Sequence, residues 1–259
     1  QDVVLADIAR QVDAGAQHIT FGDPDFFNGP GHALRIVREL HHRFPALTYD
    51  VTIKVEHLLK HAAHLPVLRD TGCLFVTSAV ESFDDRILGI FDKRHTGADV
   101  RRAVALLRGS RLALNPTFVA FTPWTTLDVY RAFLAAIDEL DLVGSVAPIQ
   151  YAIRLLIPAG SRLLELPLIQ EFLGDFDDRG LCYRWSHPDP RVDELCASIL
   201  AAVQAGQQTG ATRHDLFATV QQIAQAAGAA PSPDGRTLAG ARERGARAPI
   251  PHLSEPWYC

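Results

Sequence analysis

The chain has 259 residues, 47% of them hydrophobic, and a formal net charge of -5 at pH 7. This length and apolar content are enough for one sizeable core, with or without appended segments. The negative charge gives no sign of a nucleic-acid partner. No apolar run is as long as a membrane span, and no signal peptide opens the chain. We therefore expect a cytoplasmic protein with no membrane or nucleic-acid partner.

Helical periodicity and strand-like runs alternate over the first 151 residues. The predicted helices lie at 3–14, with Asp2 as a cap, and at 32–44, 57–65, 84–91, 98–108 and 127–140. The predicted strands lie at 18–21, 47–55, 73–77, 111–119 and 143–151. Such alternation predicts βαβ units, a parallel sheet and right-handed crossovers. A barrel or partial barrel is favoured over a doubly wound sheet, because polar residues follow successive strands and no Rossmann glycine fingerprint is present.

Beyond residue 151 the pattern changes. Residues 157–167 look like an irregular extension, and a helical pair is predicted at 190–207 and 212–227. From 228 onward the sequence is rich in Gly, Pro, Ala and Arg, which predicts a disordered tail. The expected organisation is a barrel core at 1–166, a helical extension at 167–227 and a flexible tail at 228–259.

The segment FGDPDFFNGPG at 21–31 follows the first predicted strand and holds more polar chemistry than an ordinary turn needs. In a parallel β/α barrel, ligands bind at the carboxyl ends of the strands. Collecting polar residues by that rule gives the candidate ligand-binding residues Gly22, Asp23, Asp25, Lys54, Glu56, Ser78, Glu81, Lys93, Asn115, Gln150 and Arg154. Their mixed charges and amides favour a zwitterionic, hydroxyl-bearing ligand over a bare phosphate.

Structural roles are the alternative for several of these residues. Asp23 and Asp25 could support the turn or cap the next helix. Glu81 could be a carboxylate in the first turn of a helix, and Lys93 could be a cation at a helix end. Lys54 and Glu56 could form a surface pair. His57, His61 and His64 have helix-face spacing that could bind a metal. That face carries no carboxylate, so a solvated helix surface is favoured.

The order of four segments resembles the radical S-adenosylmethionine (SAM) superfamily. GDP at 22–24 resembles its Gly-Gly-Glu-Pro loop, and VES…DKRHTGADV at 80–100 resembles a Glu-Ser after a strand followed by a helix and a basic-His-Thr turn. NPTFVAFTPWTT at 115–126 and QYAIRLLIP at 150–158 resemble later barrel strands and their loops. The resemblance covers roughly residues 3–166, and its most specific part is VES…DKRHTGADV.

The resemblance implies an α/β fold with a partial six-stranded, TIM-like β/α barrel. It also implies a 4Fe-4S cluster held by a Cys-x3-Cys-x2-Cys loop, with SAM cleaved reductively to a 5′-deoxyadenosyl radical. An electron donor such as flavodoxin or ferredoxin, and a small-molecule or peptide substrate, would complete such an oxidoreductase. This sequence has no Cys-x3-Cys-x2-Cys and no methionine. We expect that loop and the first strand upstream of Gln1, which makes the chain an inactive fragment; true loss of the cluster is the alternative.

The resemblance also implies roles for the candidate residues. Gly22 and Asp23 would face the SAM amino group, and Lys93 or Arg94 would pair with its carboxylate. Ser78, Glu81 and Asn115 would bind the ribose hydroxyls. Gln150 and Arg154 would lie near the adenine end or the substrate, and Lys54 and Glu56 could contact either ligand.

The four cysteines are far apart and fit no zinc pattern, so we expect them to be reduced: Cys73, Cys182, Cys196 and Cys259. The last follows two aromatics, and the tail resembles that of a radical SAM group ending in Cys-Cys-Ala-Glu-Pro or Cys-selenocysteine-Ala-Glu-Pro. A UGA codon read as a stop would end the chain at Cys259. One hypothesis is therefore a selenoprotein with a catalytic Cys259, and the other is an ordinary terminal cysteine. Two further functions compete with the radical enzyme: a Schiff-base barrel enzyme using Lys54, and a non-catalytic barrel scaffold.

Overall fold

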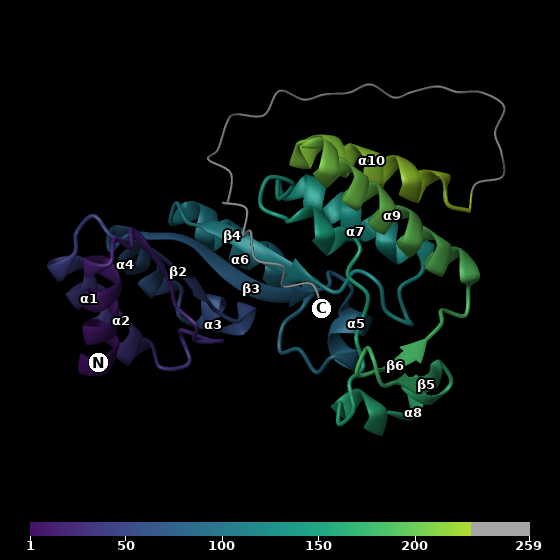
Figure 1. Cartoon of the computed structure of the whole chain (residues 1–259), viewed down its shortest axis with the longest axis horizontal. Helices are drawn as coiled ribbons and strands as arrows, with labels where there is room; N and C mark the ends of the chain where they lie inside the picture. Colours follow the sequence, from purple (N-terminus) through teal and green to yellow (C-terminus); the bar gives the residue numbers. More distant parts are fainter. Residues whose placement is uncertain (229–259) are drawn as a thin grey trace. The chain divides into compact units, whose positions relative to one another are not determined.

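The computed structural model describes residues 1–228 and divides the chain into two compact units (Figure 1). The first unit runs from Gln1 to Phe118, and the second begins at Val119. The predicted tail from residue 229 onward, Cys259 included, lies outside the described residues. No helix among residues 1–228 is long and apolar enough to cross a bilayer.

The first unit is a four-stranded parallel sheet with connecting helices. Its strands are β1 (His18–Thr20), β2 (Thr48–Thr52), β3 (Cys73–Glu81) and β4 (Ala113–Phe118), paired in the order β1-β2-β3-β4. Its helices are α1 (Asp2–Asp13), α2 (Pro30–Arg43), α3 (Val55–Lys60), α4 (Leu65–Asp70), α5 (Asp85–Ile90) and α6 (Gly97–Gly109), with a 3-10 turn η1 at Ala62–His64. The predicted βαβ alternation and parallel pairing are confirmed.

Local sequence signals explain where these helices start. Asp84 caps α5 by accepting a hydrogen bond from the Ile87 N–H. Thr96 and Asp99 form a reciprocal capping box at the start of α6. Pro30 occupies the first turn of α2, where a backbone N–H has no partner within the helix, so proline's lack of an N–H costs no hydrogen bond there.

The two faces of the sheet differ in chemistry. One face is apolar and buried against helices: Val51 and Val76 are fully buried there, and the Tyr49 hydroxyl donates to the Leu68 carbonyl in α4. The opposite face, which we call the polar face, carries Thr20, Asp50, Thr52, Thr77, Asn115 and Thr117, which the register of the strands places on one side. Parallel sheets are usually covered by apolar packing on both sides. The polar face differs from this pattern, and we expect a ligand or other polar groups to contact it.

The second unit is mainly helical. It contains α7 (Leu127–Glu139), the 3-10 turns η2 (Pro148–Tyr151) and η3 (Arg162–Glu165), α8 (Pro167–Gln170), the antiparallel hairpin β5 (Leu173–Asp177) and β6 (Cys182–Trp185), α9 (Pro190–Thr209) and α10 (Arg213–Ala226). Helices α9 and α10 pack together, and α10 also packs on α7. The helical pair predicted at 190–207 and 212–227 is confirmed.

The strand predicted at 143–151 is wrong. The segment ends in the 3-10 turn η2, with Pro148 in its first turn, because proline lacks the N–H that a strand ladder needs. Extended backbone returns only around Arg154, which forms an isolated parallel bridge with Phe121. The sheet of the first unit therefore has four strands, and the closed or partial barrel stays a prediction.

Other boundaries also need correction. β2 ends at Thr52, and Lys54 is the N-cap of α3, so Lys54 does not lie on a strand. The helix predicted at 57–65 is the end of α3 followed by η1, and the separate helix α4 was not predicted. Gln1, not Asp2, is the N-cap of α1. The hairpin β5–β6 was also not predicted.

Candidate functional site

The loop after β1 is held by its own side chains. The Asp23 carboxylate accepts a hydrogen bond from the Asp25 N–H at 2.9 Å, which is an Asx turn, and the Phe26 N–H donates to the Thr52 carbonyl at the end of β2. Phe26 and Phe27 are buried. The loop thus uses its two phenylalanines as anchors and leaves Gly22 and Asp23 exposed.

Asp25 has a different environment from Asp23, because it is only 5% exposed. Its Oδ2 lies 2.7 Å from His57 Nδ1 and 3.6 Å from Lys54 Nζ, and its Oδ1 accepts a hydrogen bond from the Lys54 N–H at 3.3 Å. Asp25 therefore binds the start of α3, which is a role in the protein's own structure. Glu56 lies in the first turn of the same helix, where the helix dipole favours a carboxylate.

A cavity of about 570 Å³ lies between α1, β1, the loop and α2. Gly22, Asp23 and Asn28 line it, and this volume is within the range of small-molecule sites. Lys54, Glu81, Lys93 and Asn115 do not line it. The cavity therefore includes the loop and, through Thr20, one end of the polar face, but not the Glu81–Lys93 pair.

Glu81 and Lys93 form an ion pair at the carboxyl end of β3. Lys93 Nζ donates to Glu81 Oε1 at 2.7 Å, and the side chains are 28% and 19% exposed, respectively. Asn115 lies beside β3 on the polar face, and its amide donates to the Thr77 hydroxyl at 3.1 Å. All three predicted residues belong to the first unit, but only Glu81 and Lys93 are in contact at the end of a strand, because Asn115 pairs with Thr77, four residues before Glu81.

Glu81 also has an unusual backbone. Five non-glycine residues among 1–228 have positive φ: Glu81, Asp92, Arg111, Asp141 and Leu181. Three of them directly follow the C-caps of α5, α6 and α7, where a left-handed residue closes the helix, and Leu181 lies in the β5–β6 turn. Glu81, with φ of 65°, is the one at the end of a parallel strand. Strain that the fold retains at such a place is typical of functional sites.

Ser78 lies on the other side of β3. It is fully buried, and its hydroxyl donates to the Ile53 carbonyl at 2.6 Å. The structure does not bring Ser78 together with Asn115, because side chains alternate between the two faces along a strand and Asn115 pairs with Thr77.

His95 is a half-buried residue that we did not single out from the sequence, although it lies within the DKRHTG motif. Its Nε2 lies 3.2 Å from the Val80 carbonyl, to which it donates. Burial, and then the nearby Lys93 charge, lower the pKa of His95. The neutral ring thus ties the turn after α5 to the last residues of β3.

This lowered pKa predicts a pH dependence of stability. As the pH falls, His95 is protonated in the unfolded chain before it is protonated in the folded chain. The contribution of neutral His95 to the free energy of unfolding is therefore present above about pH 6.5 and is lost as the pH falls towards the folded-state pKa. His95→Gln keeps an N–H donor but does not titrate, so it should reduce the loss of stability between pH 7 and pH 5. Urea unfolding followed by circular dichroism measures this, with the exposed His42→Gln as the control. An unchanged pH slope in His95→Gln would contradict the assignment.

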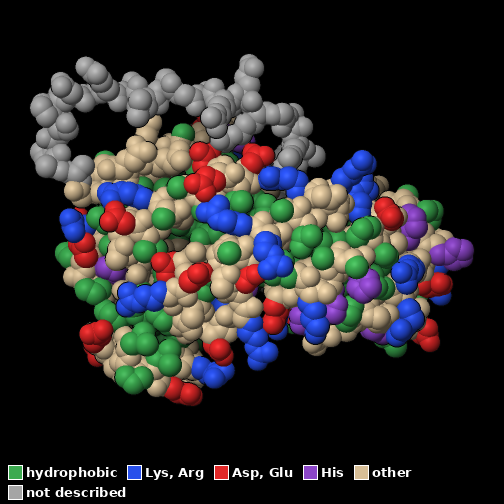
Figure 2. Space-filling view, turned by 180° about the vertical axis from the view of Figure 1, so that it is seen from behind, with side chains coloured by type: hydrophobic (Ala, Val, Ile, Leu, Met, Phe, Trp, Pro, Cys, Tyr) green, Lys and Arg blue, Asp and Glu red, His purple; other side chains and the backbone are tan. Residues whose placement is uncertain are grey.

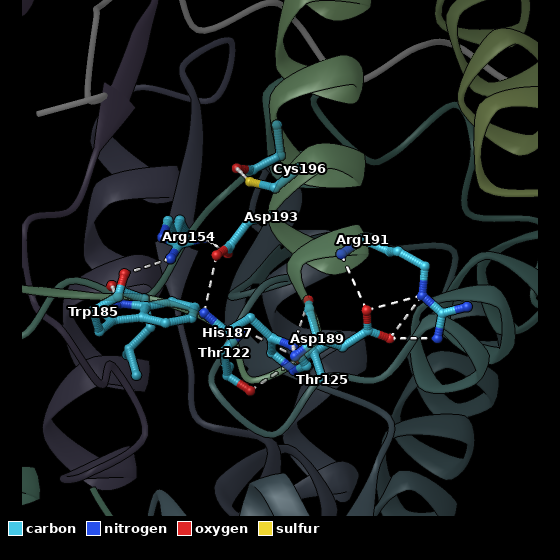
Figure 3. Close-up of polar contacts among 11 residues, drawn as sticks. Thr122, Thr125, Arg154, Trp185, His187, Asp189, Arg191, Asp193 and Cys196 are labelled. Carbon is cyan, nitrogen blue, oxygen red and sulfur yellow. Dashed lines mark hydrogen bonds and ion pairs between the residues drawn. The ribbon is translucent and has the colours of Figure 1, made fainter. Parts of the chain in front are cut away.

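The candidate residues Gln150 and Arg154 belong to the second unit. Arg154 donates to Asp193 Oδ1 at 2.6 Å and to the Trp185 carbonyl at 2.7 Å, and its guanidinium lies 3.5 Å from the centre of the Trp185 ring (Figure 3). Asp193 in turn accepts a hydrogen bond from the His187 N–H. Arg154 thus joins the hairpin to α9. Gln150 lies in η2 and is half-buried.

Iron–sulfur clusters are held by cysteine thiolates. Burial raises the pKa of the Cys73 thiol to about 12 and also raises that of Cys196. Within residues 1–228, no group of three His, Cys, Asp or Glu side chains could hold a metal ion. The described residues therefore do not fit a 4Fe-4S cluster.

Lys54 does not have the surroundings of a Schiff-base lysine. Such a lysine is desolvated in an apolar pocket or placed beside another cation. The Lys54 side chain is 59% exposed and lies beside the Asp25 carboxylate. This environment does not favour the Schiff-base alternative.

Comparison with known proteins supports the fold. No family model matches the sequence. Similar solved structures include the cobalamin-dependent S-adenosylmethionine radical enzyme OxsB with aqua-cobalamin bound, with a TM-score of 0.65 and 14% identity over 85% of this chain and 40% of that chain. OxsB with aqua-cobalamin and S-adenosylmethionine bound gives a TM-score of 0.63 and 12% identity over 81% and 38%.

The chain thus spans about two fifths of the length of the OxsB chains. At such low identity the likeness concerns the fold and not the site. Over 85% of this chain, the mixed α/β fold is similar to that of OxsB.

Proposed function

We propose that this chain is the SAM-binding part of a radical SAM enzyme, with SAM bound at the carboxyl-end edge of the polar face. The observation that carries the proposal is Glu81. It is half-buried, left-handed at the end of β3, and oriented by its ion pair with Lys93. A strained carboxylate fixed at a strand end is expected where a ligand uses it.

The donors and acceptors at this edge match the chemistry of SAM. A carboxylate and an ammonium, side by side in Glu81 and Lys93, can exchange their mutual pairing for the amino and carboxylate groups of a methionyl zwitterion. The hydroxyl and amide side chains of Thr77 and Asn115 are suited to ribose hydroxyls. The overall likeness to an enzyme solved with SAM bound is consistent with this choice.

In a radical SAM enzyme, a cluster supplies the electron that cleaves SAM. Residues 1–228 do not fit that cluster, so the contribution we assign to them is binding, orientation and shielding of SAM. The same proposal implies a substrate and an electron donor for the enzyme. We assign neither of them to particular residues of this chain.

Calorimetric titration with SAM tests the proposal on the 259-residue chain. We expect saturable binding that Lys93→Gln weakens by at least about tenfold, because a hydrogen bond between charged groups is lost. Lys60→Gln, which changes an exposed lysine of α3 that has no part in the proposed site, should bind like the wild type. No binding by the wild-type chain, or equal binding by the two variants, would contradict the proposed site.

A further inference from the structure

We infer that His57 is a positioning residue: it holds Asp25, and through Asp25 the loop 22–28, against the start of α3. The inference rests on the proposed function only in the claim that the fixed loop serves ligand binding. The physical tie between His57 and the loop stands on the geometry of the first unit alone.

The loop depends on Asp25 because it has few other ties. Apart from the packing of Phe26 and Phe27 and the bond from Phe26 to Thr52, the polar contacts of residues 22–28 with neighbouring elements within 1–228 run through the Asp25 carboxylate. That carboxylate is 5% exposed, and its Oδ2 is closed to solvent and accepts no hydrogen bond. A buried carboxylate requires a partner that supplies a proton or a charge.

His57 is the partner that matters more. Its Nδ1 lies 2.7 Å from Asp25 Oδ2, and its side chain is 18% exposed. Lys54 Nζ lies 3.6 Å from the same oxygen, and the Lys54 side chain is 59% exposed. Water screens and replaces an exposed ammonium easily, whereas nothing replaces a shielded ring nitrogen.

The neighbouring histidines add to this contact. Phe27 of the loop meets the rings of His61 and His64 edge-on, at 5.9 and 6.2 Å between ring centres, and His57 lies 5.8 Å from His61. Figure 2 shows several histidine side chains, in purple, over the unit formed by residues 1–118. The face expected to be a solvated helix surface therefore packs in part against the loop.

The chemistry of the contact allows a matched pair of variants. His57 Nδ1 and Asp25 Oδ2 lie 2.7 Å apart without the alignment of a hydrogen bond, so the tie is an electrostatic contact of the ring nitrogen with the carboxylate. His57→Asn places an amide N–H close to the position of Nδ1, and His57→Gln places it near Nε2. Asparagine should therefore preserve the tie to Asp25, and glutamine should break it.

Hydrogen exchange of the amides at 25–28 in the full chain is the first measurement. We expect His57→Gln to speed exchange by about tenfold or more, and His57→Asn and Lys54→Gln to stay close to the wild type. Equal exchange in His57→Gln and the wild type overturns the inference. If His57→Gln fails to fold, Asp25→Asn, which removes the carboxylate charge from the same contact, takes its place: faster exchange than in the wild type supports the inference, and unchanged exchange overturns it.

Titration of the same variants with SAM tests the link to the ligand. We expect a weaker affinity in His57→Gln that His57→Asn restores. If the wild type does not bind SAM, the proposed function fails and the exchange result still decides the tie. If exchange rises in His57→Gln while SAM affinity is unchanged, the loop is tied by His57 but does not position the ligand, and the positioning role is overturned.

Discussion

Replacing Gly97 with alanine should destabilise the Gln1–Phe118 unit by about 3 kcal/mol, the upper part of the usual range for overpacking. A Cβ on Gly97 would lie 2.5 Å from the Phe83 carbonyl oxygen, and backbone cannot move aside as a side-chain end can. Gly97 is buried, and its N–H donates to the Asp85 carboxylate at 2.7 Å. Any shift of α6 that relieves the clash would stretch this bond as well.

Gly89→Ala is the matched control for Gly97→Ala. A Cβ there meets nothing within 4 Å, and Gly89 lies inside α5, so alanine should stabilise the unit by about 0.5–1 kcal/mol. Urea unfolding followed by circular dichroism measures both. Tryptophan fluorescence does not report on this unit, because Trp124, Trp185 and Trp257 all follow Phe118. Equal stability of Gly97→Ala and the wild type would show that the contact to Phe83 is not tight.

Replacing Glu81 with glycine should weaken SAM binding by about tenfold to a hundredfold, the effect of losing a hydrogen bond to a charged group. Stability should change by no more than about 1 kcal/mol, because the relief of a left-handed non-glycine residue offsets the lost ion pair and the greater freedom of the unfolded chain. Calorimetric titration and urea unfolding of the same preparation give both numbers.

Arg111→Gly is the control for Glu81→Gly. Arg111 also has a left-handed backbone, with φ of 58°, but it closes α6 and is exposed. Glycine there relieves the same kind of strain, so SAM affinity should stay that of the wild type. Equal losses of affinity in both variants would assign the effect to the backbone and not to the Glu81 carboxylate.

Much of the first unit could be predicted because its signals are local. Thr96 with Asp99, and Asp84 three residues before Ile87, mark helix starts within one turn of chain. β3 begins with the apolar run CLFV at 73–76, as expected for a buried parallel strand. Such elements form from neighbouring residues, and a reading of the sequence recovers them.

The errors lie where local signals conflict. The segment 143–151 is rich in β-branched residues, but Pro148 cannot donate to a ladder and directs the chain into a 3-10 turn. The hairpin β5–β6 has polar residues and a glycine at its turn, yet β5 carries Gly174 and the two aspartates Asp175 and Asp177, which weaken a strand pattern. Its pairing depends on contacts such as that of the Tyr183 N–H with the Ile157 carbonyl, which no short window contains.

The candidate site was predictable in part for a similar reason. Glu81, Lys93 and Asn115 could be collected as polar residues after strands, and the structure places them in one unit. The position of Ser78 on the opposite face could have been derived from strict alternation along β3. The role of Asp25 could not, because its partner His57 lies on another helix and the pairing depends on how α3 packs.

The order β1-β2-β3-β4 has a consequence for how the first unit folds. Every strand pairs with the strand that follows it in the sequence: His18 meets Thr48, Tyr49 meets Cys73, and Phe75 meets Ala113. The entropic cost of closing a loop, expressed as a free energy, rises by only about 0.6 kcal/mol for each doubling of the loop length. The three pairings therefore have similar entropic costs. Pairing each strand with its neighbour in the sequence keeps the contacts as local as a parallel sheet allows. The sheet can therefore grow strand by strand while the chain is synthesised, before the ribosome has made the unit that begins at Val119.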